Sequence, residues 1–120
     1  MSNTSIVIVA GKIRVDPAKR DKVLETGAQL MVDTRTQKGC LDYVWTADPT
    51  DPARIYVFER WESKEDLAAH LAGNYYLRMR DHVGSAGLTE AETLKYRIDW
   101  VEQVYDETMT PRADFFTAPD

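Results

Sequence analysis

Hydrophobic and polar side chains alternate along four segments of the chain. Alternation with a period of two is typical of β-strands, because successive side chains point to opposite faces of a sheet. The predicted strands are residues 6–15, 40–46, 54–61 and 94–100, and the last of them can extend to residue 105. In the second strand the alternation predicts that Leu41, Tyr43 and Trp45 share one face.

Two of these strands are apolar on both faces. The strand at 6–15 carries Ile8 among its even positions, while its odd positions are also suited to burial. The strand at 54–61 carries Tyr56 and Phe58 on the face opposite its other apolar side chains. A strand of this kind needs cover on both sides. We therefore expect both faces of the sheet to be covered.

A first helix is predicted between the first two strands. Asp16 can cap its first turn, and Pro17 fits the first helical position because no backbone donor is needed there. The helix carries apolar side chains at helical spacing as far as Val32 and should run to about residue 38, where Gly39 supplies a left-handed stop.

A second helical stretch is predicted after the third strand. Ser63, with Asp66 three residues later, forms the start of a capping box. The helix should break at residues 73–74 and continue as another helical piece over residues 75–83.

The resulting order of elements is βαββαβ. This order predicts an α+β domain of the ferredoxin-like type, in which an antiparallel sheet carries its helices on one face. The second apolar face then needs a partner, and the sheet of a second copy is the economical one. We therefore expect a homodimer through the sheet faces, a dimeric α+β barrel. Residues 1–105 should form this domain, and residues 106–120 should form a C-terminal tail that can pack on the partner subunit.

Composition narrows the range of partners and locations. Fifteen Lys and Arg are scattered among 20 Asp and Glu, for a net charge of −5, so we expect neither nucleic acid nor an anionic membrane as a partner. Cys40 is the single cysteine, and residues 1–5 lack the features of a secretory signal. The prediction is a cytoplasmic protein. No group of residues has metal-ligand spacing, and no glycine-rich phosphate loop is present.

His70 is the first candidate for chemistry. It lies on the same helical stripe as Leu67 and Leu71, so its ring should point toward the sheet. An imidazole with an ordinary pKa near ~6.5 could take a phenolic proton at neutral pH. The alternative is a structural histidine whose ring binds a backbone carbonyl.

Glu59 is the second candidate. Its place between Val57 and Trp61 predicts a carboxylate on a buried strand face, which is costly unless the group is paired. Glu59 could orient His70 or raise its basicity. It could equally be bonded to a neighbouring strand or to a cation at the dimer contact.

Aromatic and basic side chains complete the candidates. Tyr43, Trp45, Trp61 and Trp100 could form a wall for a planar ligand, or could simply belong to the core. Arg80 could hold an anionic substrate group, although a solvated helix face explains it as well.

Several short motifs together resemble a known family. In order, they are Gly39-Cys40-Leu41-Asp42-Tyr43, Asp51-Pro52, Glu59-Arg60-Trp61-Glu62-Ser63 and Ala69-His70-Leu71. This succession, over residues 6–79, resembles the antibiotic-biosynthesis monooxygenase family, which includes small quinol monooxygenases and aldol-type signalling-molecule isomerases. Members form dimeric α+β barrels, and several oxidise phenolic or quinol-like substrates with dioxygen and use no metal, flavin or haem.

The resemblance implies a monooxygenase without a cofactor that acts on a small aromatic substrate. An electron-rich substrate can itself reduce oxygen once it is deprotonated, so the protein needs a dry pocket, a base and donors for the developing anion. Two other functions stay open. One is an isomerase or other proton-transfer enzyme on the same pocket, and the other is a non-catalytic dimeric protein that binds a small ligand.

The resemblance also suggests residue roles. Many relatives carry a second histidine at the place where this chain has Tyr75, so His70 would be the base. Tyr75 or Tyr76 would be a donor, and the motif position favours Tyr75. The haem-degrading branch of the fold uses an Asn, a Trp and a His where this chain has Gly11, His70 and Arg80. The predicted catalytic residues are therefore His70 and Tyr75, and the predicted substrate-binding residues are Trp61, Tyr43, Glu59, Arg80, Asn74 and Trp100.

Overall fold

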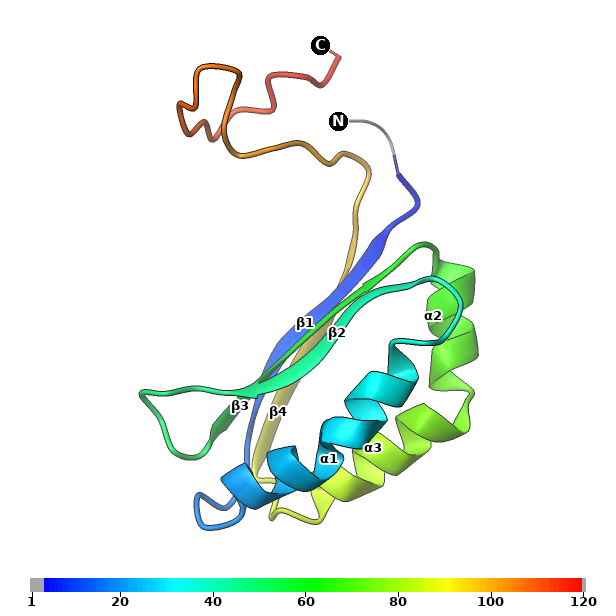
Figure 1. Ribbon diagram of the computed structural model, residues 1–120, viewed down its shortest axis with the longest axis vertical. Helices are drawn as coiled ribbons and strands as arrows, with labels where there is room; N and C mark the ends of the chain where they lie inside the picture. Colours follow the sequence, from blue (N-terminus) through cyan, green and yellow to red (C-terminus); the bar gives the residue numbers. More distant parts are fainter. Residues whose placement is uncertain (1–3, 120) are drawn as a thin grey trace.

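A four-stranded antiparallel sheet carries three helices on one face (Figure 1). The computed structural model describes residues 4–119. Residues 1–3 of the predicted domain and residue 120 of the predicted C-terminal tail therefore lie outside the described part. The elements are β1 (Val7–Arg14), α1 (Arg20–Thr34), β2 (Cys40–Ala47), β3 (Arg54–Trp61), α2 (Lys64–Leu71), α3 (Asn74–Gly84) and β4 (Glu90–Arg97). The strand order is β2-β3-β1-β4. The predicted α+β, ferredoxin-like fold is confirmed.

Strand β3 shows why the sheet has two different faces. Ile55 and Trp61 are fully buried under the helices, whereas Tyr56 and Phe58 on the opposite face remain 41% and 39% exposed. Both faces are apolar, as the alternation predicts. Only the inner face is covered by this chain's own helices (Figure 1).

The first helix is shorter than the sequence pattern predicts. Asp16 does accept a hydrogen bond from the backbone of Ala18, but this bond closes a turn, and α1 begins only at Arg20. At the other end α1 stops at Thr34, and a further turn leads to Gly39, which has a φ of +79°. Turn-forming residues at each end were therefore predicted as helix.

The second helical stretch agrees with its prediction. The Ser63 hydroxyl caps α2 by accepting a hydrogen bond from the backbone N–H of Asp66. The predicted break at residues 73–74 separates α2 from α3. A change of direction here brings α3 alongside α1 (Figure 1).

Two strand predictions need correction. The fourth strand begins at Glu90 and ends at Arg97, because pairing with β1 rather than side-chain alternation sets its limits. Trp100 and Tyr105 therefore lie beyond it. In β2 the register shifts between Cys40 and Asp42, and this bulge leaves Leu41 exposed instead of sharing the face of Tyr43.

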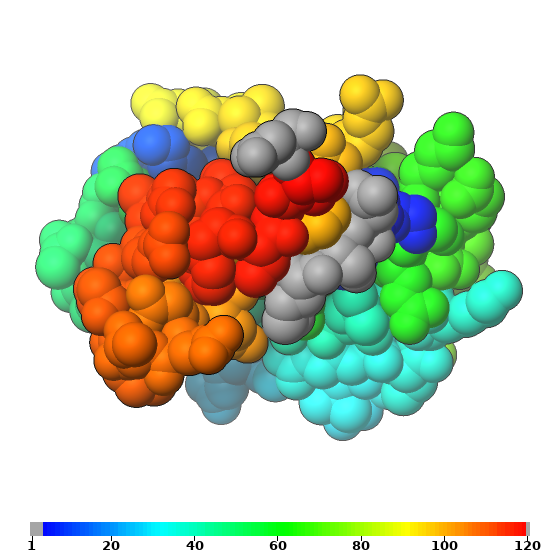
Figure 2. All heavy atoms as spheres, turned by 90° about the horizontal axis from the view of Figure 1, so that it is seen from above, coloured from blue at the N-terminus to red at the C-terminus, as the bar shows by residue number. Residues whose placement is uncertain are grey.

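Residues 98–119, which we call the C-terminal arm, project from the sheet. The radius of gyration is 16.5 Å, against about 14 Å expected for a compact chain of this length. The Glu102 carboxylate organises the arm by accepting hydrogen bonds from Trp100, Phe116 and Thr117. The arm bends away from the helices and lies across one end of the molecule, orange to red in Figure 2.

None of the helices in the described part of the chain has the length and apolar character needed to cross a membrane.

Gly11 allows β1 and β4 to approach each other closely. A Cβ atom added there would lie 2.2 Å from the backbone oxygen of Glu92, so Gly11→Ala must push the strands apart. We expect this change to lower the free energy of unfolding by about 1–3 kcal/mol, as for other overpacked sites. Gly84→Ala is the matched control, because nothing lies within 4 Å of its added Cβ. Urea denaturation should show the control unchanged or more stable, and equal stability of the two variants would contradict the account.

Candidate functional site

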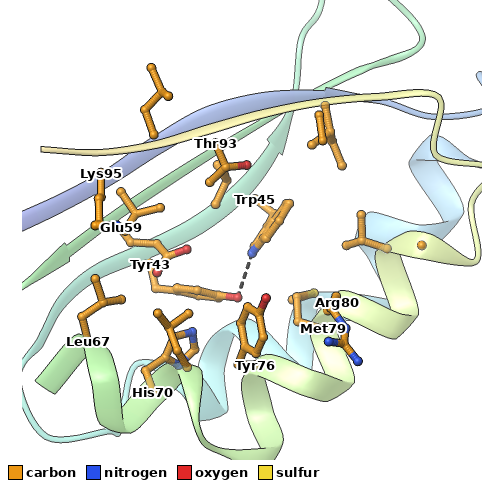
Figure 3. Close-up of a pocket in the computed structure, with 18 of the residues that line it drawn as sticks. Tyr43, Trp45, Glu59, Leu67, His70, Tyr76, Met79, Arg80, Thr93 and Lys95 are labelled. Carbon is orange, nitrogen blue, oxygen red and sulfur yellow. Dashed lines mark hydrogen bonds between the residues drawn. The ribbon is translucent and has the colours of Figure 1, made fainter.

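A cavity of about 410 Å³ lies between the inner face of the sheet and helices α2 and α3 (Figure 3). Its walls are mainly apolar. They include Val9, Ile13, Val57, Leu67, Met79 and Val83. Eight residues with polar groups also line it: Tyr43, Trp45, Glu59, His70, Tyr76, Arg80, Thr93 and Lys95. A mostly apolar cavity of this size with a few converging polar groups is typical of small-molecule sites.

Glu59 supplies the only carboxylate among the residues that line the cavity. Its place in β3 directs it inward, where it is 7% exposed and accepts a hydrogen bond of 2.9 Å from Trp61 Nε1. Burial raises the pKa of Glu59 to about 6, because the charged form loses its water, and the Trp61 hydrogen bond offsets only part of this effect. Glu59 is therefore a base whose pKa lies near neutrality.

His70 is buried and neutral at physiological pH. Its Nδ1 lies 2.7 Å from the side-chain oxygen of Gln37, which can only accept, so Nδ1 carries the proton. Burial lowers the pKa of His70 to about 4. The lone pair on Nε2 has no hydrogen-bond partner among residues 4–119. This atom can accept a hydrogen bond from a ligand in the cavity.

Aromatic rings fix the orientation of His70. Trp61 stacks on the imidazole with centroids 4.7 Å apart, and Tyr43 and Tyr76 approach its edges at 5.6 and 5.9 Å. Trp61 is fully buried and stands behind His70, so it supports the site rather than lining it.

Tyr43 carries a hydroxyl group that can donate into the cavity. Trp45 Nε1 donates a 2.8 Å hydrogen bond to the Tyr43 oxygen, the dashed line in Figure 3. Burial raises the pKa of Tyr43 well above its usual value, so the hydroxyl stays protonated. Because its oxygen already accepts from Trp45, the proton is free to point elsewhere.

The structure brings some of the predicted site residues together and separates others. Tyr43, Glu59, His70 and Arg80 line the cavity. Tyr75, Asn74 and Trp100 do not line it, and the Trp100 indole instead donates to Glu102 and Thr117 within the C-terminal arm.

Four lining residues with polar groups were absent from the final set of predicted site residues: Trp45, Tyr76, Thr93 and Lys95. Helical spacing could have found Tyr76, because it lies three residues before Met79 and seven before Val83, both of which are buried on the inward side of α3. Trp45 was predicted as part of the aromatic wall, and it does line the cavity. Lys95 lies at a polar position of β4, and only the pairing of β4 with β1 assigns it to the inner face.

Known proteins share both the sequence pattern and the fold. The profile of the antibiotic biosynthesis monooxygenase family matches residues 6–82. An uncharacterised protein of Synechocystis is 27% identical over 70 residues, which are 58% of this chain, and the chain spans about half the length of this curated relative.

Solved structures extend the comparison to three dimensions. A conserved protein of Methanosarcina mazei superposes with a TM-score of 0.71 at 21% identity, covering 78% of this chain and 93% of that one. A protein of Caulobacter crescentus with a provisional antibiotic biosynthesis monooxygenase name gives 0.71 at 22% identity, covering 84% and 94%. These likenesses show the fold.

His70 should make stability depend on pH. The unfolded chain takes up a proton near pH 6.5 and the folded chain only near 4, so stability is lost as pH falls through this window. His70→Gln should remove a loss of about 3 kcal/mol between pH 7 and 4. Leu71→Gln, the next residue in α2, changes no titrating group and should keep the full dependence. Denaturant unfolding at several pH values measures how the free energy of unfolding depends on pH. Identical pH profiles for His70→Gln and the parent would contradict the lowered pKa of His70.

Proposed function

The chain belongs to the antibiotic biosynthesis monooxygenase family, and on that premise we propose that it oxidises a small phenol- or quinol-like substrate with dioxygen, using no metal or flavin. The observation that carries this proposal is Glu59, a buried carboxylate with a pKa of about 6 that lines a mainly apolar cavity. Such a group can take a proton from an aromatic hydroxyl at neutral pH.

Glu59 is a better base than His70. A phenol has a pKa of about 10, so proton transfer to Glu59 is uphill by about 4 units, or roughly 5 kcal/mol. Transfer to His70 is uphill by about 6 units, or roughly 8 kcal/mol. The difference corresponds to a factor of about 100 in the deprotonated fraction. We therefore assign the base to Glu59, and to His70 the role of accepting a hydrogen bond through Nε2.

The reaction balances without a further reductant. Once Glu59 holds the hydroxyl proton, the aromatic anion is electron-rich and transfers electrons to dioxygen. A ring carbon then loses its hydrogen and gains one oxygen atom as a quinone carbonyl, while the second oxygen atom leaves as water. The substrate supplies all four electrons. In the site, the Tyr43 hydroxyl can donate to the oxygen on which negative charge develops.

The same base also suits a proton-transfer reaction such as an isomerisation. Oxygen uptake separates the two functions, because an isomerase consumes none.

Replacement of Glu59 tests the base. Glu59→Gln should lower turnover of a quinol panel at least 100-fold, the usual contribution of a general base, as measured with an oxygen electrode. In the parent protein kcat should rise as pH increases through about 6, because only the ionised Glu59 accepts a proton. Glu62→Gln, an exposed neighbour just after β3, is the control and should retain full activity. A kcat that rises through pH 4 instead would assign the base to His70.

The outer face of the sheet supports a proposal about assembly. Tyr56, Phe58, Leu94 and Tyr96 are each 39–48% exposed on the face without helices. Leu94 of β4 and Phe58 of β3 both pair with Ala10 of β1, so the four side chains lie on one face of the sheet, on the two strands that flank β1. We propose that a second copy of the chain packs on this patch. One two-fold contact would cover the outer sheet faces of both copies at once. The C-terminal arm bends toward the same side and would lie against that copy (Figure 1).

A charge placed in this patch should separate the subunits. Sedimentation should give the parent about twice the 13.7 kDa mass of one chain, and Phe58→Glu should give a single chain. Val32→Glu, an equally exposed apolar residue on α1, should remain a dimer. A parent protein that sediments as one chain would end this proposal.

A further inference from the structure

Lys95 places a positive charge on the covered side of the sheet. It pairs with Val9 of β1, and Val9 pairs on its other side with Glu59 of β3. Residues that face each other on neighbouring antiparallel strands point to the same side. Lys95, Val9 and Glu59 therefore form a row across the inner face, with the two charged residues about 10 Å apart at their Cα atoms.

The charge of Lys95 is not used within the described part of the chain. It takes part in none of the ion pairs between residues 4 and 119, nor in a side-chain hydrogen bond there. Lys95 does not pair with Glu59 either, since burial and the Trp61 hydrogen bond alone account for the pKa of the Glu59 carboxyl. Lys95 is exposed, as are all residues of the edge strand β4, and it also lines the cavity, so its ammonium group is available to a ligand there.

A second cation stands at the cavity. The guanidinium group of Arg80 lies over the ring of Tyr76, with 5.9 Å between the guanidinium carbon and the ring centroid. The Arg80 side chain is 58% exposed. Its contact with Asp81 is long, at 3.4 Å. The cavity thus has two cations and one carboxylate in a chain whose net charge is −5. A concave site with this local excess of positive charge attracts anions.

A lysine on an edge strand can also serve to prevent strand-to-strand association. That role requires only an exposed positive charge and makes no distinction between ligands. Selectivity for an anionic ligand therefore separates a binding role from the protective one.

We propose that the ligand of this cavity is an aromatic molecule that carries an acidic substituent, such as a carboxylate, as well as a hydroxyl group. The hydroxyl lies toward Glu59, and the anionic substituent is held by Lys95. Arg80 faces the same ligand from α3. This substrate class rests on the proposed function for its hydroxyl group, whereas the anion site rests only on the two cations.

Two fluorescent probes that differ by one carboxylate test the inference. They are 6-hydroxy-2-naphthoate and 2-naphthol, titrated into the intact protein at low salt. The parent should bind the acid about tenfold more tightly, as expected for one charge-assisted contact. Lys95→Met should remove this preference and leave the affinity for 2-naphthol unchanged.

The control variant is Lys22→Met, which removes the same charge from an exposed position on α1 away from the cavity and should keep the preference. Equal affinities of the parent for the two probes, no binding of either, or a preference that survives Lys95→Met would each overturn the inference. Oxygen uptake is recorded separately. Selective binding without oxygen uptake would count against the proposed monooxygenase and leave the anion site standing.

Discussion

The burial of one carboxylate, Glu59, is the constraint on which the site depends. Its position on the inner face of β3 follows from the same alternation that buries Ile55 and Trp61. A single hydrogen bond from Trp61 Nε1 offsets part of the cost, and no cation among residues 4–119 pairs with the carboxylate. A carboxyl group left in this condition has its pKa moved toward neutrality. The acid–base capacity of the cavity is therefore a product of the fold.

The same burial acts in opposite directions on the two titrating groups. It raises the pKa of Glu59 to about 6 and lowers that of His70 to about 4, because desolvation disfavours whichever form is charged. At pH 7 the site thus holds an ionised carboxylate beside a neutral imidazole. His70 keeps a defined tautomer through Gln37, so it offers an acceptor at Nε2 rather than a proton.

Sequence patterns correctly predicted the elements that are specified by local signals in the chain. The alternation in β3 and the Ser63 cap of α2 are local signals, and both were confirmed. Other predictions failed because they depended on distant pairing. Strand β4 begins with the mainly polar residues 90–93, and only its contact with β1 makes them a strand. Lys95 was therefore not among the predicted site residues. Likewise Tyr75 was chosen by motif position, although α3 restarts at Asn74 and turns Tyr76 toward the cavity.

The free-energy cost of burying the ionised Glu59 carboxylate supports its proposed role as a base. At pH 7 a carboxyl whose pKa is raised from 4.5 to about 6 costs about 2 kcal/mol of stability relative to the same group in water. Elsewhere the chain treats carboxylates in the opposite way: Asp48 and Asp51, in the turn between β2 and β3, have lowered pKa values because hydroxyl, backbone and arginine donors surround them. An uncharged residue at position 59 could fill the same space without the cost. Since total stability is only about 5–15 kcal/mol, a penalty of this size supports the proposed role, in which the destabilised carboxylate takes a proton from a bound ligand.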